Sequence, residues 1–136
     1  MYLTYILFKW YYLHMFKRVL CILSLLIMLP VHAGVFDSAV KENEKVFLYF
    51  YTDKCSYCEK FAPIYEKIVQ KYTKKCSFAK VDYKSDEGRV LAKTFMLYYV
   101  PDVILLDYKK QTLNRLEPSC IVDYACVKNA VDELVK

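Results

Sequence analysis

The chain has 136 residues, which suits one folded domain, and it is 57% hydrophobic and 17% aromatic, so it can bury a core. Its 2 glycines and 4 prolines are too few for a low-complexity or disordered chain. The net charge is +5, of which Lys9, Lys17 and Arg18 supply three charges, and the remaining charges of both signs are interspersed, so we expect no nucleic-acid partner.

The N-terminal segment has the three parts of a secretory signal peptide. A basic pair, Lys17-Arg18, precedes an apolar run from Val19 to Leu29, and the small residue Ala33 follows shortly after. The apolar run is shorter than the about 20 residues that are needed to cross a bilayer. We therefore predict a signal peptide over residues 1–33, with cleavage after Ala33.

Two alternatives stay open for this segment. The residues before Met15 are aromatic and apolar, unlike a normal leader, so Met15 could be the true start. If the leader is kept, its two apolar runs form a membrane anchor, which is the only membrane contact that we expect. With cleavage, residues 34–136 form an exported domain in the periplasm or an equivalent secretory compartment.

Both histidines, His14 and His32, precede the predicted cleavage site. The exported domain would therefore have no histidine, which excludes a Cys–His hydrolase, a Cys/His zinc finger and a CxxCH haem attachment site. The sequence also has no flavin or nucleotide motif, so we expect no metal and no cofactor.

Next along the chain, residues 36–43 are predicted as a short helix that Asp37 or Ser38 could cap. The continuous apolar and aromatic run Val46–Tyr51 is typical of a strand that is buried on both faces, as in a parallel sheet. From Ser56 to Tyr72, apolar residues recur at spacings of three and four, which predicts an amphipathic helix. Pro63 lies inside this helix and is expected to kink it.

The rest of the chain continues the alternation of strands and helices, which predicts an α/β sandwich. The turn at residues 107–111 is short, so the last two strands should be antiparallel. Apolar residues from Cys120 to Leu134 recur at helical spacing and predict a final amphipathic helix. The expected elements are a strand at 78–83, a helix at 86–95 with Ser85 as its cap, strands at 103–106 and 112–116, and this last helix.

Cys55-Ser56-Tyr57-Cys58 lies between the buried strand and the amphipathic helix. The first N–H groups of a helix are unpaired and its macrodipole is positive there, so a thiolate at Cys55 is stabilised and its pKa falls. Cys58 lies one turn later, where it can attack a mixed disulfide at Cys55. We predict Cys55 as the catalytic nucleophile and Cys58 as the resolving, more buried thiol.

These features resemble the thioredoxin superfamily over about residues 36–135. The strand, the CxxC motif and Pro63 match its strand, motif and kinked helix, and Val100-Pro101 resembles its cis-proline turn. The resemblance implies a three-layer α/β/α sandwich with a four-stranded mixed central sheet. It also implies that Pro101 is cis beside the cysteines and that the backbone of Val100 binds an extended substrate.

The sequence departs from the family pattern around the motif. Lys54 stands where a tryptophan is usual, Ser56-Tyr57 replace Gly-Pro, and Tyr49 replaces the buried acid that often lies below the site. Asp102 after the proline is also unusual. Tyr57 and the pair Tyr98-Tyr99 could line a substrate groove, or they could be half-buried packing residues.

Three further cysteines follow the redox pair, Cys76, Cys120 and Cys126. An odd number of cysteines in an exported domain suggests a free thiol or an intermolecular bond. If Cys120 precedes the last helix, it could form a disulfide with Cys126. If both are helical, they lie on different faces, and Cys120 is then a small buried apolar residue.

The resulting prediction is an exported, monomeric thiol–disulfide oxidoreductase that exchanges disulfides with protein substrates through Cys55 and Cys58. Its partners would be protein thiols and disulfides and an unidentified redox partner protein. The alternative is a non-catalytic interaction module of the cell envelope, with the thioredoxin fold and a structural CxxC disulfide. The midpoint potential of the disulfide separates the two, because structural disulfides lie below about −300 mV.

Overall fold

The computed structural model of the protein describes residues 34–136. The predicted leader, its cleavage after Ala33 and the alternative start at Met15 concern residues outside this range. In chain order the elements are α2 (Val35–Glu42), β1 (Lys45–Tyr51), α3 (Ser56–Tyr72), β2 (Ser77–Asp82), α4 (Asp86–Thr94), β3 (Asp102–Asp107), β4 (Thr112–Arg115), the 3-10 helix η1 (Pro118–Val122) and α5 (Tyr124–Leu134).

The four strands form one mixed sheet in the order β2-β1-β3-β4. β1 pairs with β2 in parallel and with β3 in antiparallel orientation, and β4 pairs with β3 in antiparallel orientation. Residues 46–50 of β1 are buried, as expected for an apolar strand at the centre of a sheet that is covered on both faces. The predicted four-stranded mixed sheet is confirmed.

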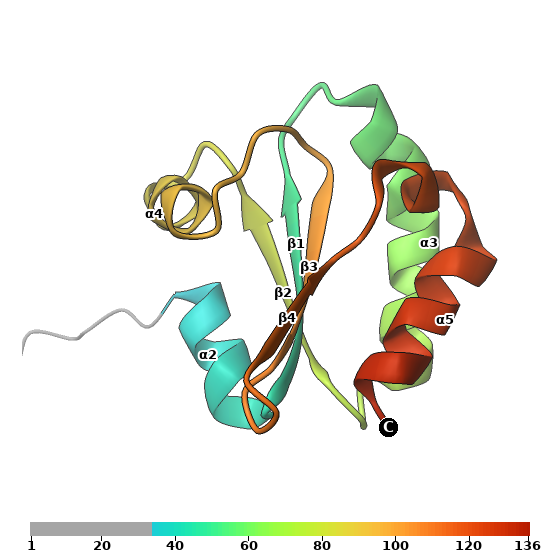
Figure 1. Cartoon of the computed structure of the whole chain (residues 1–136). Coiled ribbons are helices and arrows are strands. Elements are labelled where there is room, and N and C mark those ends of the chain that lie inside the picture. The colour runs from blue at the N-terminus through green and yellow to red at the C-terminus, as the bar shows by residue number, and fades with distance from the viewer. Residues whose placement is uncertain (1–33) are drawn as a thin grey trace, which may run out of the picture. The chain divides into compact units, whose positions relative to one another are not determined.

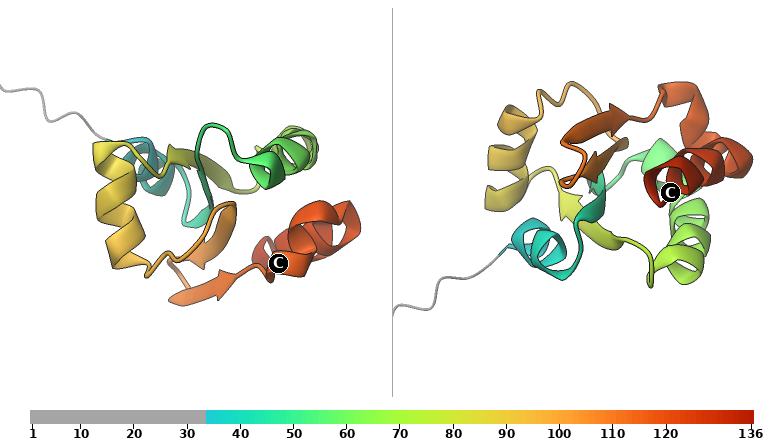
Figure 2. Two further views of the ribbon diagram at one scale, coloured as in Figure 1. Left: turned by 90° about the horizontal axis from the view of Figure 1, so that it is seen from above. Right: turned by 60° about the horizontal axis from the view of Figure 1, so that its bottom comes forward.

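Helices cover both faces of this sheet, which confirms the three-layer sandwich (Figure 1). α2 and α4 lie on one face, and α3 and α5 lie on the other, as the view from above also shows (Figure 2). Alternate residues of β1 enter the two cores: Phe47 and Tyr49 pack toward α3 and α5, while Leu48 and Phe50 pack on the opposite side. None of the helices in residues 34–136 has the length and hydropathy that a bilayer-spanning helix needs.

The start of α2 differs from the prediction. Neither Asp37 nor Ser38 caps the helix, because the cap position is Gly34, which has no side chain to accept a hydrogen bond. Instead, the carboxylate of Glu87 in α4 accepts hydrogen bonds from the backbone N–H groups of Val35 at 3.1 Å and Phe36 at 2.8 Å. A residue 51 positions away in sequence thus replaces the local cap.

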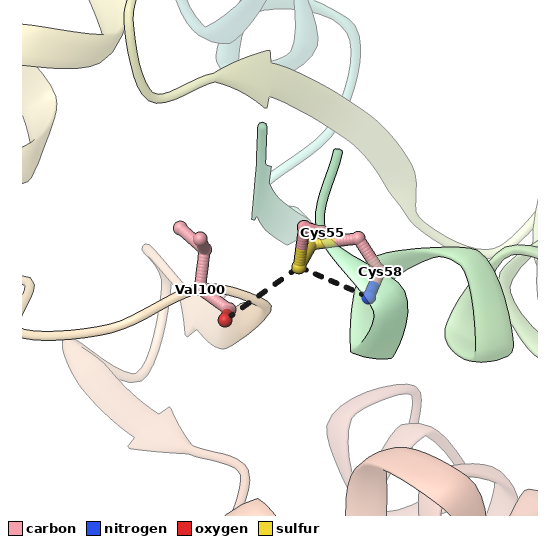
Figure 3. The surroundings of a disulfide bond; sticks show 3 residues. All are labelled: Cys55, Cys58 and Val100. Atoms are coloured by element: carbon pink, nitrogen blue, oxygen red, sulfur yellow. Dashed lines mark hydrogen bonds between the residues drawn. A yellow bond between two sulfur atoms is a disulfide. The ribbon is translucent and has the colours of Figure 1, made fainter. Parts of the chain in front are cut away.

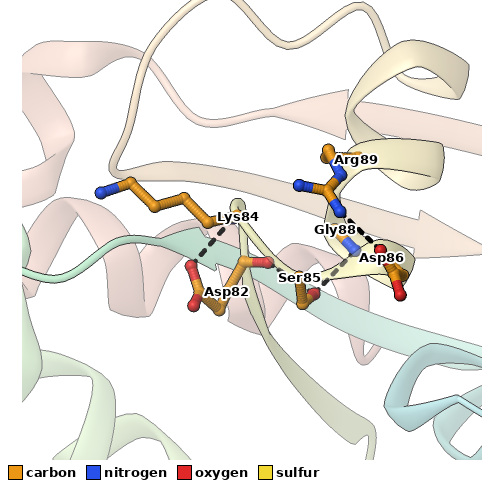
Figure 4. A network of polar contacts seen from close by, with 6 residues as sticks. All are labelled: Asp82, Lys84, Ser85, Asp86, Gly88 and Arg89. Atoms are coloured by element: carbon orange, nitrogen blue, oxygen red, sulfur yellow. Dashed lines mark hydrogen bonds and ion pairs between the residues drawn. The ribbon is translucent and has the colours of Figure 1, made fainter.

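Ser85 caps α4 as predicted, and its contacts join this helix to the end of β2 (Figure 4). Its hydroxyl accepts a hydrogen bond from the Gly88 N–H at 2.9 Å and donates one to the Asp82 carbonyl at 2.7 Å. The helix therefore begins close to the β2 backbone. A Cβ at Gly88 would lie 1.9 Å from the Asp82 carbonyl oxygen, so only glycine fits there.

The final helix is shorter than predicted. It begins at Tyr124, and Cys120 lies before it in η1. The boundary follows from Asp123, whose carboxylate accepts hydrogen bonds from the N–H groups of Ala125 at 2.8 Å and Cys126 at 3.4 Å. An aspartate that caps in this way marks the start of a helix. The apolar spacing that predicted one helix from Cys120 onward therefore spans two separate helices, η1 and α5.

Candidate active site at the start of α3

Cys55 is the N-cap residue of α3 and follows the turn after β1. Lys54 has a φ of 59°, and this left-handed conformation turns the chain from the strand into the helix. The backbone N–H of Cys58 donates a hydrogen bond to Cys55 Sγ over 3.2 Å. The sulfur therefore occupies the position where a helix start offers unpaired N–H groups and positive potential.

Cys55 and Cys58 are joined by a disulfide, with their Cα atoms 5.2 Å apart. Cys58 is 6% exposed and belongs to the core side of α3, whereas Cys55 is partly exposed. This asymmetry agrees with Cys55 as the attacking sulfur and Cys58 as the shielded one. Tyr57 lies between them on the exposed side of the turn, with the Lys60 ammonium 5.2 Å from its ring centroid.

The loop before β3 approaches the disulfide from the other side (Figure 3). The Val100–Pro101 peptide bond is cis, and the Val100 carbonyl oxygen lies 3.8 Å from Cys55 Sγ. A disulfide sulfur carries no hydrogen, so this contact becomes a hydrogen bond only when Cys55 is a protonated thiol. Segments 45 residues apart in sequence thus meet at Cys55 Sγ.

Tyr49 lies in the core beneath α3, where the resemblance implies a buried acid in other family members. It is 1% exposed, and its ring centroid lies 4.9 Å from that of Phe61 in α3. Burial, with a smaller contribution from Tyr65, raises the pKa of Tyr49 to about 12. The phenol is therefore neutral at physiological pH and carries no charge that would oppose a thiolate.

A second polar feature of this region was not predicted. Arg115 at the end of β4 contacts Asp102, the first residue of β3, with 3.4 Å between Arg115 Nε and Asp102 Oδ2. Asp102 is 1% exposed, and neither of its carboxylate oxygens has a hydrogen-bond partner. A charged residue that follows a proline and begins an apolar run was the available signal for Asp102. No local pattern identified Arg115.

The remaining cysteines of the described part divide into a disulfide and a free thiol. Cys120 lies in η1, before the last helix, and forms a disulfide with Cys126, with their Cα atoms 5.4 Å apart, so the alternative in which both belong to the last helix is wrong. Cys76 is free and buried, and this burial raises the pKa of its thiol to about 11. Within residues 34–136, no three His, Cys, Asp or Glu side chains come together as a possible metal site.

Comparison with known proteins places the site in a family. The sequence profile described as Thioredoxin matches residues 27–119. The match to the protein disulfide-isomerase of Hordeum vulgare is 31% identical over 77 residues. It covers 54% of this chain and 15% of that protein. The match to thioredoxin 1 of Plasmodium falciparum (isolate 3D7) is 43% identical over 47 residues, and it covers 35% of this chain and 44% of that protein.

The chain thus spans less than half the length of these curated relatives. Among solved structures, a mutant thioredoxin from Halobacterium salinarum NRC-1 superposes with a TM-score of 0.62 at 23% identity, over 74% of this chain and 83% of that one. This last likeness shows the fold. The profile match covers more than half of the chain, and the chain therefore belongs to the thioredoxin family.

Proposed function

We propose that this protein is an exported thiol–disulfide oxidoreductase that exchanges disulfides with protein substrates through Cys55 and Cys58. The observation that carries the proposal is the hydrogen bond from the Cys58 N–H to Cys55 Sγ at the start of α3. This N–H and the positive end of the helix stabilise a thiolate at Cys55, which is the attacking species in disulfide exchange.

In the reducing direction, the Cys55 thiolate attacks one sulfur of a substrate disulfide. A bond forms between these two sulfurs, the substrate S–S bond breaks, and the second substrate sulfur leaves as a thiolate. Cys58 then attacks Cys55 Sγ, which closes the Cys55–Cys58 bond and releases the first substrate sulfur. Two electrons pass from the protein dithiol to the substrate, and the reverse sequence forms a substrate disulfide.

Cys58 must lose its proton before it attacks, and Tyr49 cannot accept it. The pKa of Tyr49 is raised to about 12 by burial, so its phenol is already protonated near neutral pH. The departing substrate thiolate leaves without a proton and is therefore available as a base, and the pKa of an ordinary cysteine thiol is about 8.5. In our proposal the proton of Cys58 therefore passes to that thiolate.

We assign substrate binding to Val100, Pro101 and Tyr57, which lie next to the two cysteines in space or in sequence. An extended peptide that reaches Cys55 Sγ passes the Val100 carbonyl, which lies 3.8 Å from this sulfur. A backbone N–H of this substrate peptide can donate a hydrogen bond to the Val100 carbonyl, as in strand addition. Tyr57 is 59% exposed and offers an aromatic surface beside the attacked disulfide.

The proposed location is the periplasm or an equivalent secretory compartment, and the domain is expected to act as a monomer with an unidentified redox partner protein. The basic pair and apolar run of the leader support export. The Cys120–Cys126 disulfide supports export too, because structural disulfides persist mainly in oxidising compartments.

N-terminal sequencing of the protein from cells should find a chain that begins at Gly34, and a chain that begins at Met1 or Met15 in the membrane would contradict cleavage.

Trapping of substrates tests the activity. A Cys58→Ser variant can form the mixed disulfide at Cys55 but cannot resolve it, so covalent adducts should accumulate and disappear on reduction. The matched control is Cys55→Ser, which should trap no substrate. If neither variant forms adducts and the Cys55–Cys58 midpoint lies below about −300 mV, the protein is an interaction module with a structural disulfide instead.

A further inference from the structure

The loop at residues 95–101 joins α4 to β3 and brings Val100 to the reactive sulfur. Phe95, Leu97 and Val100 pack against the core on the α2 and α4 face of the sheet. The other side chains point outward: Met96 is 68% exposed, and Tyr98 is 82% exposed. Apolar packing therefore holds only part of a loop whose position decides where the Val100 carbonyl lies.

Arg115 contacts both ends of this loop. Its guanidinium donates hydrogen bonds to the carbonyl of Phe95 and, over 3.3 Å, to the carbonyl of Met96. Its Nε lies 3.4 Å from the carboxylate of Asp102, which follows the loop directly. A planar guanidinium with five N–H donors can hold several acceptors in fixed positions at once.

Arg115 itself is held by the sheet. It pairs with Ile104 across β4 and β3, and its side chain is 28% exposed, so the charged group lies mostly under the loop rather than in solvent. Met96 has a φ of 50°, a conformation that a non-glycine residue rarely adopts. The hydrogen bond from Arg115 to the Met96 carbonyl stabilises the chain at this point.

Asp102 is otherwise unexplained by the packing of β3. Its side chain is fully buried beside Phe50 in the sheet register, where an apolar residue would fit the neighbouring core. Burial raises the pKa of Asp102, and the charge of Arg115 opposes this change. A buried carboxylate without hydrogen bonds is costly unless a cation compensates it, and the cation next to it is Arg115.

We propose that Arg115, supported by Asp102, is a positioning residue that fixes the loop at residues 95–101, so that the Val100 carbonyl faces Cys55 Sγ and an incoming peptide. The effect of this positioning on peptide reduction rests on the proposed disulfide exchange, but the position of the loop can be measured separately. Neither residue touches the sulfurs. They act on the peptide-binding edge and leave the intrinsic reactivity of Cys55 unchanged.

Two substrates of different size distinguish an effect on the position of a bound peptide from an effect on the reactivity of Cys55. The protein, with its Cys55–Cys58 disulfide reduced and its Cys120–Cys126 disulfide intact, is reacted with a synthetic peptide that contains one disulfide and with a small aromatic disulfide that has no peptide backbone. In Arg115→Gln and Arg115→Lys, the rate constant for the peptide should fall on the order of tenfold, because misplaced substrates react slowly. The rate constant for the small disulfide should stay within about twofold of the original value in both variants.

The lysine variant shows whether the loop needs the several hydrogen bonds of the guanidinium or only its positive charge. A single ammonium keeps the positive charge but cannot hold Phe95, Met96 and Asp102 together, so Arg115→Lys should not restore the peptide rate. Asp102→Asn has the same shape as the original and should show a smaller loss in the same direction. Arg89→Gln is the matched control, since Arg89 is an exposed arginine whose ion partner is Asp86, and both of its rates should stay unchanged.

Hydrogen exchange of the oxidised protein measures how well the loop is held in place, and this measurement does not depend on catalytic activity. The amides of residues 96–100 should exchange faster in the Arg115 variants and in Asp102→Asn, but not in Arg89→Gln. Unchanged exchange, or equal losses with both disulfides, would overturn the positioning role. If the original protein reduces no peptide, the proposed function fails, while the exchange data still decide whether Arg115 fixes the loop. Should Arg115→Gln not fold, the lysine variant and Asp102→Asn carry the same comparison.

Discussion

Cys55 and Cys58 are three residues apart, yet the structure surrounds them differently. Cys55 caps the helix and accepts the Cys58 N–H, whereas Cys58 is 6% exposed and packs on the core side of α3. The charged groups of the neighbouring residues Asp53, Lys54 and Glu59 are exposed, so solvent screens their effect on the site. The helix start is therefore the main influence on the Cys55 thiol.

At the residue scale, we predict that reduced Cys55 has a pKa below the ordinary value of about 8.5, since the helix start stabilises its thiolate. The rate of alkylation against pH, measured on reduced Cys58→Ser, should reach half its maximum below that pH. Reduced Cys55→Ser, in which Cys58 is the remaining thiol of the pair, should react more slowly because Cys58 is shielded. Equal rates for the two variants would contradict the assignment of the nucleophile.

At the scale of elements, the start of α4 depends on the absence of a side chain at one position. A Cβ at Gly88 would lie 1.9 Å from the Asp82 carbonyl oxygen, which is backbone and cannot move alone. Gly88→Ala should therefore lower the free energy of unfolding by about 1–3 kcal/mol, as for other overpacked sites. Urea denaturation measures the change.

The matched control on the same helix is Val90→Ala. Val90 is 65% exposed, so its truncation should change the free energy of unfolding by less than about 0.5 kcal/mol. If Gly88→Ala proves no more harmful than this control, α4 can move away from β2 and the close approach is not required.

A hydrogen-bonded group joins the two helices on the other face of the sheet. The Tyr72 hydroxyl in α3 donates a hydrogen bond to Asp132 in α5 over 2.5 Å, and Lys128 donates another to the same carboxylate over 2.6 Å. The Lys128 bond, followed by the Tyr72 bond, lowers the pKa of Asp132 below its ordinary value of 3.8. Both bonds favour the ionised carboxylate in the folded state.

A lowered pKa in the folded state gives a defined direction of pH dependence. The contribution of Asp132 to stability should be present above its ordinary pKa of 3.8 and should be lost as the pH falls through its lowered folded pKa. Asp132→Asn should remove this acid-dependent part of the unfolding free energy, measured by denaturation at several pH values. Glu133→Gln, a change in an exposed neighbour, should keep the original pH dependence.

At the scale of the whole molecule, η1 and α5 complete, together with α3, the layer that covers one face of the sheet. η1 packs against both α3 and α5, and the Cys120–Cys126 disulfide ties η1 to the first turn of α5. The bond closes a short loop, with a sequence separation of 6. It therefore restricts the unfolded chain around the segment that supports the active-site helix.

We predict that Cys120→Ala with Cys126→Ala lowers the free energy of unfolding by about 2 kcal/mol, as expected for a short disulfide loop. The measurement is made in a Cys55→Ser/Cys58→Ser background, so that only the second disulfide changes. In the otherwise original protein, the alkylation rate of reduced Cys55 should be unaffected by the double change. A large shift in that rate would show that the second disulfide also controls the active site.

The sequence by itself determined the features that depend on nearby residues. The apolar run of β1, the helical spacing of α3 and the capping serine of α4 each act within a few positions, so their patterns predicted the elements. The same holds for the placement of Cys55 at a helix start, because a buried strand, a short turn and an amphipathic helix follow one another directly. The thioredoxin resemblance rested on this order.

Only the tertiary structure decided which distant groups meet. Glu87 replaces the expected cap of α2 from another helix, and Arg115 contacts Met96 and Phe95 at the start of a loop, 19 and 20 residues earlier in the chain. The apolar spacing that extended the last helix to Cys120 was misleading, because a buried residue before the break satisfies the same pattern. Such contacts depend on how the layers pack, and no local pattern of residues specifies that packing.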